Sequence, residues 1–229
     1  MGQMALGYGS EFHLLRWTGR HRNKFDSKIK KLLNVDNIFW LDFDFGKDEN
    51  NPDKELVGLS FLEHEPNYST VLSKWKVEWP QKGNSMNWDL VGYTIQNEIK
   101  TWILIEAKAH IGELKQSSGA TEEGGLSKID KALAKVADNN GISISESKPW
   151  TKNHYQLANR IYVLDLLKRC GIKAKLVNIY FIGDMISKSR KSPQVKDTWI
   201  MEVNKMKQYL NVEKSNSIDI TDLYLDVDK

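Results

Sequence analysis

The segment Trp102-Ile103-Leu104-Ile105-Glu106-Ala107-Lys108 places four apolar residues directly before a carboxylate and an ammonium group. A run that is apolar on both pleat faces is typical of a central strand buried on both sides. Because side chains alternate across a strand, Glu106 and Lys108 share one face and Ala107 takes the other. Charges at the end of a buried strand are costly unless they are paired or bind a metal. The sequence therefore predicts a partner for these two charges.

The preceding segment supplies a third charged group. The residues from Asn87 to Ile95 are rich in aromatic and β-branched side chains and predict a second strand. A hairpin centred between Asn97 and Glu98, with an even-numbered loop, would set Asp89 opposite Glu106 on the same face. A slip of one residue would turn Asp89 to the other face, so the predicted constellation depends on the register.

Two facing carboxylates repel each other unless a cation lies between them. Oxygen ligands of this kind suit Mg²⁺ or Mn²⁺, which are commonly held by one or two carboxylates and keep several waters. A lysine one step along the strand could polarise a metal-bound water or neutralise charge that develops on a phosphate. The alternative interpretation is a hairpin ion pair between Lys108 and either acid.

Asp89 followed by Glu106-Ala107-Lys108 at the end of an apolar strand resembles the core motif of the PD-(D/E)xK nuclease superfamily, which includes restriction endonucleases. Trp88 stands where the eponymous proline would be. The resemblance covers Asn87 to about Gly112, and the order of the flanking elements extends it to most of the chain. It implies a mixed α/β fold of the restriction-endonuclease type, with a central mixed sheet flanked by helices.

The resemblance also implies a function. We expect Mg²⁺- or Mn²⁺-dependent phosphodiester hydrolysis of nucleic acid, most simply DNA, with Asp89, Glu106 and the carbonyl of Ala107 at the metal and Lys108 assisting the nucleophilic water. An RNA or nucleotide substrate is a further alternative. A different class of function is a catalytically silent module that binds nucleic acid or protein and keeps the fold.

Length and composition agree with one domain over residues 1–229, with a motif core at about 70–185, an N-terminal helical region at 11–64 and a C-terminal helix and acidic tail at 196–229. Hydrophobic residues make up 40% of the chain and charged residues 28%, as in ordinary globular proteins. A single cysteine excludes an intramolecular disulfide and favours a reducing, cytoplasmic setting. No apolar run approaches the length of a membrane span, so no membrane partner is expected.

The remaining elements follow from periodicity and turn residues. The tail from Ser215 is expected to be peripheral, and the residues from Asp42 to Lys54 are interpreted as a polar, acidic loop. The elements expected outside the motif strands are helices at 11–33, 55–64, 126–137, 153–168 and 197–210, and strands at 71–79 and 176–182.

Two groups of side chains are candidates for contact with a nucleic acid or for accessory roles. The net charge of +3 is too small to indicate a nucleic-acid partner by itself. Basic residues are nevertheless concentrated in the first helical region, and they could bind phosphates if they flank the acidic pair. The nucleic-acid-binding candidates are Arg16, Arg20, Arg22 and Lys24.

The accessory candidates are Glu11 on the first helix, Glu78 on the expected strand before the motif, and His110 just after it. Each has a simpler structural explanation as a solvated or hydrogen-bonded side chain. Gln156 and Arg160 are four residues apart on an expected helix and therefore share one face. Some exonuclease-like members of the superfamily carry a Gln-x-x-x-Tyr helix there, and Arg160 takes the position of the tyrosine.

Overall fold

The computed structural model describes residues 7–41, 55–82, 86–213 and 218–228. The acidic loop expected from Asp42 to Lys54 lies outside the described residues. None of the described helices is long and apolar enough to cross a membrane.

A five-stranded mixed sheet forms the centre of the molecule. Its strands lie in the order β1-β4-β5-β6-β7, with antiparallel pairing from β1 to β5 and parallel pairing from β5 to β7. The expectation of a mixed α/β fold with a central mixed sheet is confirmed at this level. The strands are β1 (Phe39–Leu41), β4 (Leu90–Gln96), β5 (Ile99–Lys108), β6 (Lys173–Ile182) and β7 (Ile220–Asp226).

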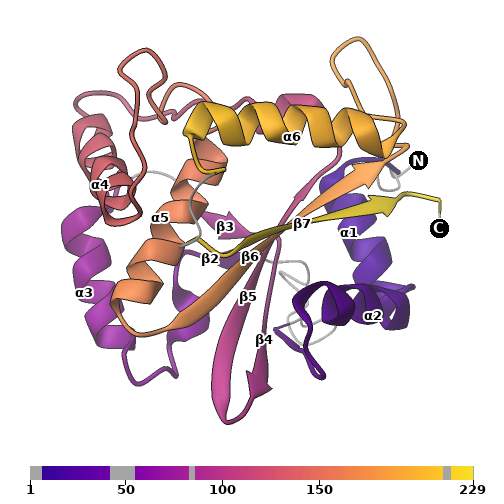
Figure 1. The fold of residues 1–229 in the computed structure, drawn as a ribbon, viewed down its shortest axis with the longest axis horizontal. Helices are drawn as coiled ribbons and strands as arrows, with labels where there is room; N and C mark the ends of the chain where they lie inside the picture. The colour runs from indigo at the N-terminus through magenta and orange to yellow at the C-terminus, as the bar shows by residue number, and fades with distance from the viewer. Residues whose placement is uncertain (1–6, 42–54, 83–85, 214–217, 229) are drawn as a thin grey trace, which may run out of the picture.

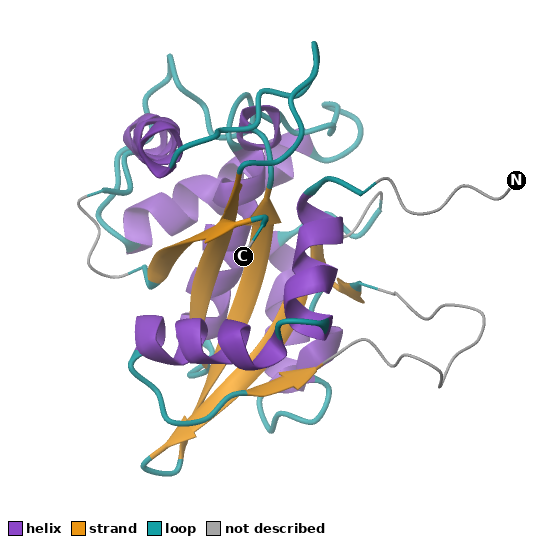
Figure 2. Ribbon diagram, turned by 90° about the vertical axis from the view of Figure 1, so that its right-hand side faces the viewer, coloured by secondary structure: helices purple, strands orange, loops and turns teal. Residues whose placement is uncertain are grey.

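Helices cover both faces of this sheet, as the two views of the ribbon show (Figures 1 and 2). One face carries α3 (Tyr68–Glu78), α4 (Leu126–Asn139), α5 (Tyr155–Arg169) and α6 (Lys196–Leu210). The other face carries α1 (Ser10–Gly19) and α2 (Arg22–Leu33), which cross in front of the sheet in Figure 2. A small sheet of β2 (Leu56–Val57) and β3 (Asn87–Trp88) and two 3-10 turns, η1 (Ser60–Leu62) and η2 (Ile111–Leu114), complete the described elements.

Alternate side chains along β5 point to opposite faces of the sheet, which explains why helices pack on both faces. Trp102 and Leu104 enter the core under α5, whereas Ile103 and Ile105 enter the core under α1 and α2. All four side chains are buried, so the prediction of a central strand with two apolar faces is confirmed.

The hairpin between β4 and β5 has the predicted centre. Gln96 pairs with Ile99, and the two residues between them, Asn97 and Glu98, have φ angles of 49° and 63°. A two-residue turn with both central residues at positive φ is the type I′ turn that matches the twist of paired strands. The ladder runs up to the pair of Leu90 with Ile105, and one further step in this register brings Asp89 beside Glu106.

Three expectations about secondary structure were wrong. Residues 71–78 belong to helix α3: Val71 and Trp75 face the core, whereas Ser73 and Val77, which would share their face in a strand, are exposed. Residues 55–64 contain the short strand β2 and the 3-10 turn η1 instead of a helix. The tail beyond Ser215 is not peripheral, since β7 pairs in parallel with β6 and buries Leu225.

Four other expected elements were confirmed to within a few residues. Helices α4, α5 and α6 and strand β6 cover the expected ranges 126–137, 153–168, 197–210 and 176–182. Strands β1 and β7 add two sheet members outside the expected core of 70–185.

Candidate functional site

Asp89 lies where β3 has ended and β4 has not yet begun. Its Oδ2 accepts a hydrogen bond of 2.6 Å from the backbone N–H of Ala107. The carboxylate of Asp89 is thereby fixed at the end of β5, between the positions of Glu106 and Lys108. The side chains of Glu106 and Lys108 lie on the sheet face covered by α5, because the even-numbered residues of β5 point that way.

Glu106 is held by three donors. Lys108 Nζ and Gln156 Nε2 both donate to its Oε1, the latter at 2.6 Å, and Arg160 Nε donates to its Oε2 at 2.7 Å. Lys108 Nζ also donates to the carbonyl oxygen of Ala107 at 3.1 Å. The ion pair between Lys108 and a carboxylate that the sequence offered as the alternative is therefore present, and Arg160 adds a second cation to it.

Arg160 is fixed on several sides. Only 3% of its surface is exposed, and its guanidinium lies 4.5 Å from the centre of the Trp88 ring. Besides Glu106, the guanidinium donates to Asn159 Oδ1 at 2.9 Å and to the carbonyl oxygen of Asn87 at 2.5 Å. All three guanidinium nitrogens have acceptors, which fixes the side chain in place. Since a guanidinium is positively charged in proteins, Arg160 holds a cation next to Glu106.

The two carboxylates differ in their affinity for protons. Burial, followed by the nearby charge of Glu106, raises the pKa of Asp89 to about 7, although Lys108 and the N–H of Ala107 act in the opposite direction. Burial would also raise the pKa of Glu106, but the charges of Arg160 and Lys108 outweigh burial and lower it. The Glu106 carboxylate is thus ionised at neutral pH, while Asp89 exchanges its proton near neutrality.

Lys108 is charged in this setting. Burial alone would lower its pKa, but the charges of Glu106 and Asp89 outweigh it, so the pKa of Lys108 lies above its usual value. The ammonium group therefore acts as a fixed cation that donates hydrogen bonds, rather than as a base.

Asp89 opens onto a polar cleft of about 710 Å³. Glu106 and Lys108 line a separate small cavity of about 20 Å³ on the other side of Gln156 and Arg160, with room for about one water molecule. The two spaces are adjacent, since Gln156 and Arg160 line both. The polar side chains that line the larger cleft include Asn87, Asp89, Gln116, Ser117, Gln156 and Arg160.

The oxygen atoms at this site fit a hard divalent cation that keeps much of its water. Oδ2 of Asp89 accepts the N–H of Ala107, so Oδ1 is the Asp89 oxygen that a cation would meet more readily. Oε1 of Gln156 is buried and has no hydrogen-bond partner among the described residues. The described residues contain no group of three or more acidic, His or Cys side chains around one point, so a cation here would have few protein ligands.

Of the accessory candidates, Gln156 and Arg160 contact Glu106, whereas Glu78, Glu11 and His110 do not. Glu78 is on α3 and accepts hydrogen bonds from Arg169 and Lys135, which outweigh the effect of burial and lower its pKa. Glu11 is exposed on α1, which covers the opposite sheet face. His110 precedes η2, where its ring and Glu113 form a capping box. Glu113 lines the small cavity together with Glu106 and Lys108, and its charge helps to raise the pKa of Lys108.

The basic residues of α1 and α2 do not line the cleft. Arg16 donates to the carbonyl oxygen of Val227 at 2.6 Å and Arg22 to that of Thr18 at 2.7 Å, so both have structural contacts. Arg20, in the turn between α1 and α2, and Lys24, on α2, are exposed, and both helices cover the face opposite Glu106.

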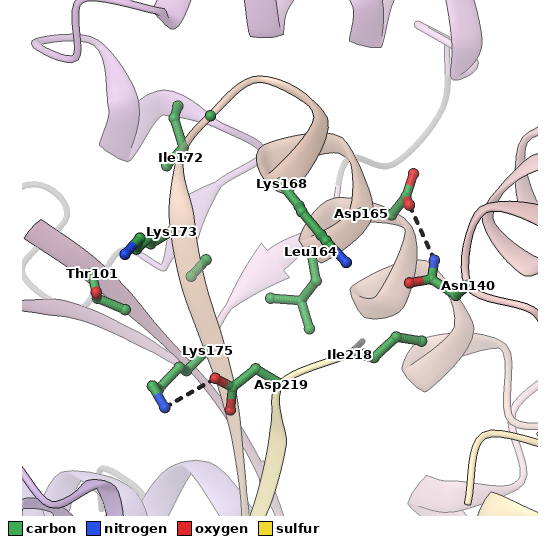
Figure 3. Close-up of a pocket in the computed structure, with 12 residues that line it drawn as sticks. Thr101, Asn140, Leu164, Asp165, Lys168, Ile172, Lys173, Lys175, Ile218 and Asp219 are labelled. Carbon is green, nitrogen blue, oxygen red and sulfur yellow. Dashed lines mark hydrogen bonds and ion pairs between the residues drawn. The ribbon is translucent and has the colours of Figure 1, made fainter. Parts of the chain in front are cut away.

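A second sizeable cavity, of about 550 Å³, lies at the other end of β5 and β6, near Thr101 and Lys173 (Figure 3). Its acidic groups are already paired, Asp219 with Lys175 at 2.9 Å and Asp165 with Asn140 at 3.1 Å. The cavity contains no part of the acidic pair.

Two contributors to the site were missed in the sequence. Asn178 pairs with Glu106 across the parallel ladder, and its Nδ2 donates to Asp222 at 3.2 Å. A polar residue within the apolar run from Leu176 to Ile182 was the available signal. The indole of Trp88 supports Arg160, which no sequence pattern indicated because the two residues are brought together only by folding.

In comparisons with known proteins, no family model, no curated protein and no solved structure matches this chain.

Proposed function

We propose that this protein is a metal-dependent nuclease of the PD-(D/E)xK type that hydrolyses phosphodiester bonds, most simply in DNA. The observation that carries the proposal is that Asp89, Glu106 and Lys108 meet at the end of β5: Asp89 accepts the N–H of Ala107 and lines a polar cleft, and Glu106 and Lys108 line the small cavity next to it. The mixed sheet with helices on both faces supports a restriction-endonuclease-like arrangement.

Each residue has a role that its surroundings support. Asp89 and the carbonyl of Ala107 would hold Mg²⁺ or Mn²⁺, with Glu106 contributing from the same face. A bound divalent cation would neutralise charge on the phosphate. Lys108 is charged and already donates hydrogen bonds in two directions, so it can orient a water molecule and stabilise negative charge developing near it.

The reaction requires no further co-reactant. The oxygen of a water molecule bonds to phosphorus, the bond from phosphorus to the leaving oxygen breaks, and the leaving oxygen takes up a proton. Because Lys108 keeps its proton at neutral pH, the proton released by the water goes to solvent or to the phosphate itself.

One observation favours a second candidate. Glu106 has three donors in place, two of them cations, which is also how a purely structural ion cluster is satisfied. A module that keeps this fold and binds nucleic acid or protein without cleaving is the corresponding alternative.

Incubation of the purified protein with supercoiled plasmid and with short single-stranded oligonucleotides, in Mg²⁺, Mn²⁺ or EDTA, separates the two candidates. The nuclease predicts cleavage in Mg²⁺ or Mn²⁺ that stops in EDTA and in the Asp89→Asn variant. Binding with no cleavage under any of these conditions would instead establish the silent module.

A further inference from the structure

We propose that Arg160 makes cation binding at this site depend on a phosphate group, so that metal and substrate enter together. The inference rests on the proposed nuclease function and assigns Arg160 as a positioning residue of that site.

The first step is the permanence of the Arg160 charge. Its three nitrogens donate to Glu106, Asn159 and the carbonyl of Asn87, at 2.5 to 2.9 Å, and its guanidinium lies against the ring of Trp88. A guanidinium does not lose its proton in proteins. The side chain is therefore neither neutralised nor readily moved away when a cation approaches.

The second step is the charge balance of the cluster. Asp89 and Glu106 together carry two negative charges when both are ionised, and Lys108 and Arg160 carry two positive charges. The four groups are balanced without a metal. A divalent cation added alone would leave these four groups with two excess positive charges at a largely buried place, where like charges repel strongly, and the neighbouring carboxylate of Glu113 can offset only one of them.

The third step identifies what restores the balance. The cleft at Asp89 is lined by neutral polar groups such as Gln116, Ser117 and Asn159, and by the guanidinium of Arg160. Besides Asp89, Glu55 is the one acidic side chain among the described residues that line it. An anion in the cleft meets polar donors and the cation of Arg160 in its lining. Phosphate is the anion that the proposed substrate carries, and each phosphate group adds at least one negative charge.

A comparison of Mn²⁺ binding with and without thymidine 3′,5′-bisphosphate tests this inference. The signal of free Mn²⁺ in electron paramagnetic resonance reports binding, and a titration of the nucleotide without protein corrects for Mn²⁺ that the nucleotide holds alone. We expect Mn²⁺ to bind the wild-type protein at least tenfold more tightly in the presence of the bisphosphate. By linkage, Mn²⁺ must strengthen nucleotide binding by the same factor, which calorimetry measures independently.

Three variants assign the effect to Arg160. Arg160→Gln should bind Mn²⁺ without the nucleotide more tightly than wild type, and the coupling factor should fall toward one. Arg160→Lys keeps the charge and should retain the coupling. Arg169→Gln is the matched control, because Arg169 is on the same helix but pairs with Glu78 and Asp165, away from the cleft.

Equal Mn²⁺ affinity of the wild-type protein with and without the bisphosphate would overturn the coupling, whether or not Arg160→Gln folds. If plasmid is still cleaved in that case, the proposed nuclease function stands and this inference alone fails. Unchanged coupling in a folded Arg160→Gln variant would remove Arg160 from the explanation. Absence of both Mn²⁺ binding and cleavage would overturn the inference and the nuclease together.

Discussion

The carboxylate of Asp89 accepts a 2.6 Å hydrogen bond from the backbone N–H of Ala107, the residue between Glu106 and Lys108. This contact joins the start of one strand of the hairpin to the end of the other. It makes the position of the Asp89 carboxylate a direct consequence of the β4–β5 register, in which Leu90 pairs with Ile105.

The first prediction concerns the pH dependence of stability. The pKa of Asp89 is raised to about 7 in the folded protein from an ordinary 3.8. A raised pKa means that the folded state holds the proton more tightly. The stabilisation is complete below the unfolded value of 3.8 and is lost as the pH rises through about 7.

The Asp89→Asn variant lacks this titration. As the pH rises from 5 to 8.5, the wild type should therefore lose unfolding free energy that the variant keeps. Allowing for partial exposure of the group, we expect a relative gain of about 1–3 kcal/mol. Urea unfolding in EDTA at both pH values measures it. A stability difference between the two proteins that does not change with pH would contradict the assigned proton affinity.

A second prediction assigns catalysis to Lys108. Glu106 keeps Gln156 and Arg160 as donors when Lys108 is removed, so the fold should survive. Lys108→Met, which keeps most of the buried volume, should lower turnover by on the order of a hundredfold or more while changing the thermal midpoint little. Lys175→Met is the control, because Lys175 is on β6 and pairs with Asp219 far from the site. Full activity of Lys108→Met would leave the ion cluster with a structural role only.

A third prediction tests the hairpin that sets the register. Glu98 has a φ of 63°, which costs a residue with a side chain roughly 1–2 kcal/mol in the left-handed region. Asn-Gly is the favoured pair in a type I′ turn, so Glu98→Gly should stabilise the protein by about 1 kcal/mol. That gain corresponds to a thermal midpoint about 2–4 °C higher for a domain of this size. Glu98→Ala should bring no such gain, and a destabilising Glu98→Gly would argue against this turn.

A fourth prediction is that the basic residues of the first helical region affect the binding of long DNA but not cleavage at the cleft. Arg20, in the turn between α1 and α2, and Lys24, on α2, are exposed on the side of the sheet away from Glu106. If long DNA wraps around that side, replacing both by Gln should reduce the slope of log affinity against log salt by about 2, since each phosphate contact contributes about 0.9. Cleavage of a short oligonucleotide should be unchanged. An unchanged salt slope for long duplex DNA would exclude these residues from phosphate binding.

Local pattern in the sequence determined the centre of the fold and the acidic pair. Four apolar residues before Glu106 specify a strand buried on both faces, and the turn at Asn97 and Glu98 specifies the register, because both depend on neighbours close in the chain. The helices α4, α5 and α6 were predicted for the same reason. The segment at 71–79 was misassigned as a strand because short apolar runs fit either period until a core selects one.

Only the tertiary structure decided what surrounds the pair. Arg160 reaches Glu106 across 54 positions of sequence and Asn87 across 73, and no local pattern constrains separations of that size. The tertiary structure also places α1 and α2, with their basic residues, on the sheet face away from Glu106. Helices pack on both faces because β5 carries apolar side chains on each. Alternation along one strand fixes which side chains share a face, but packing of distant helices fixes which charges meet there.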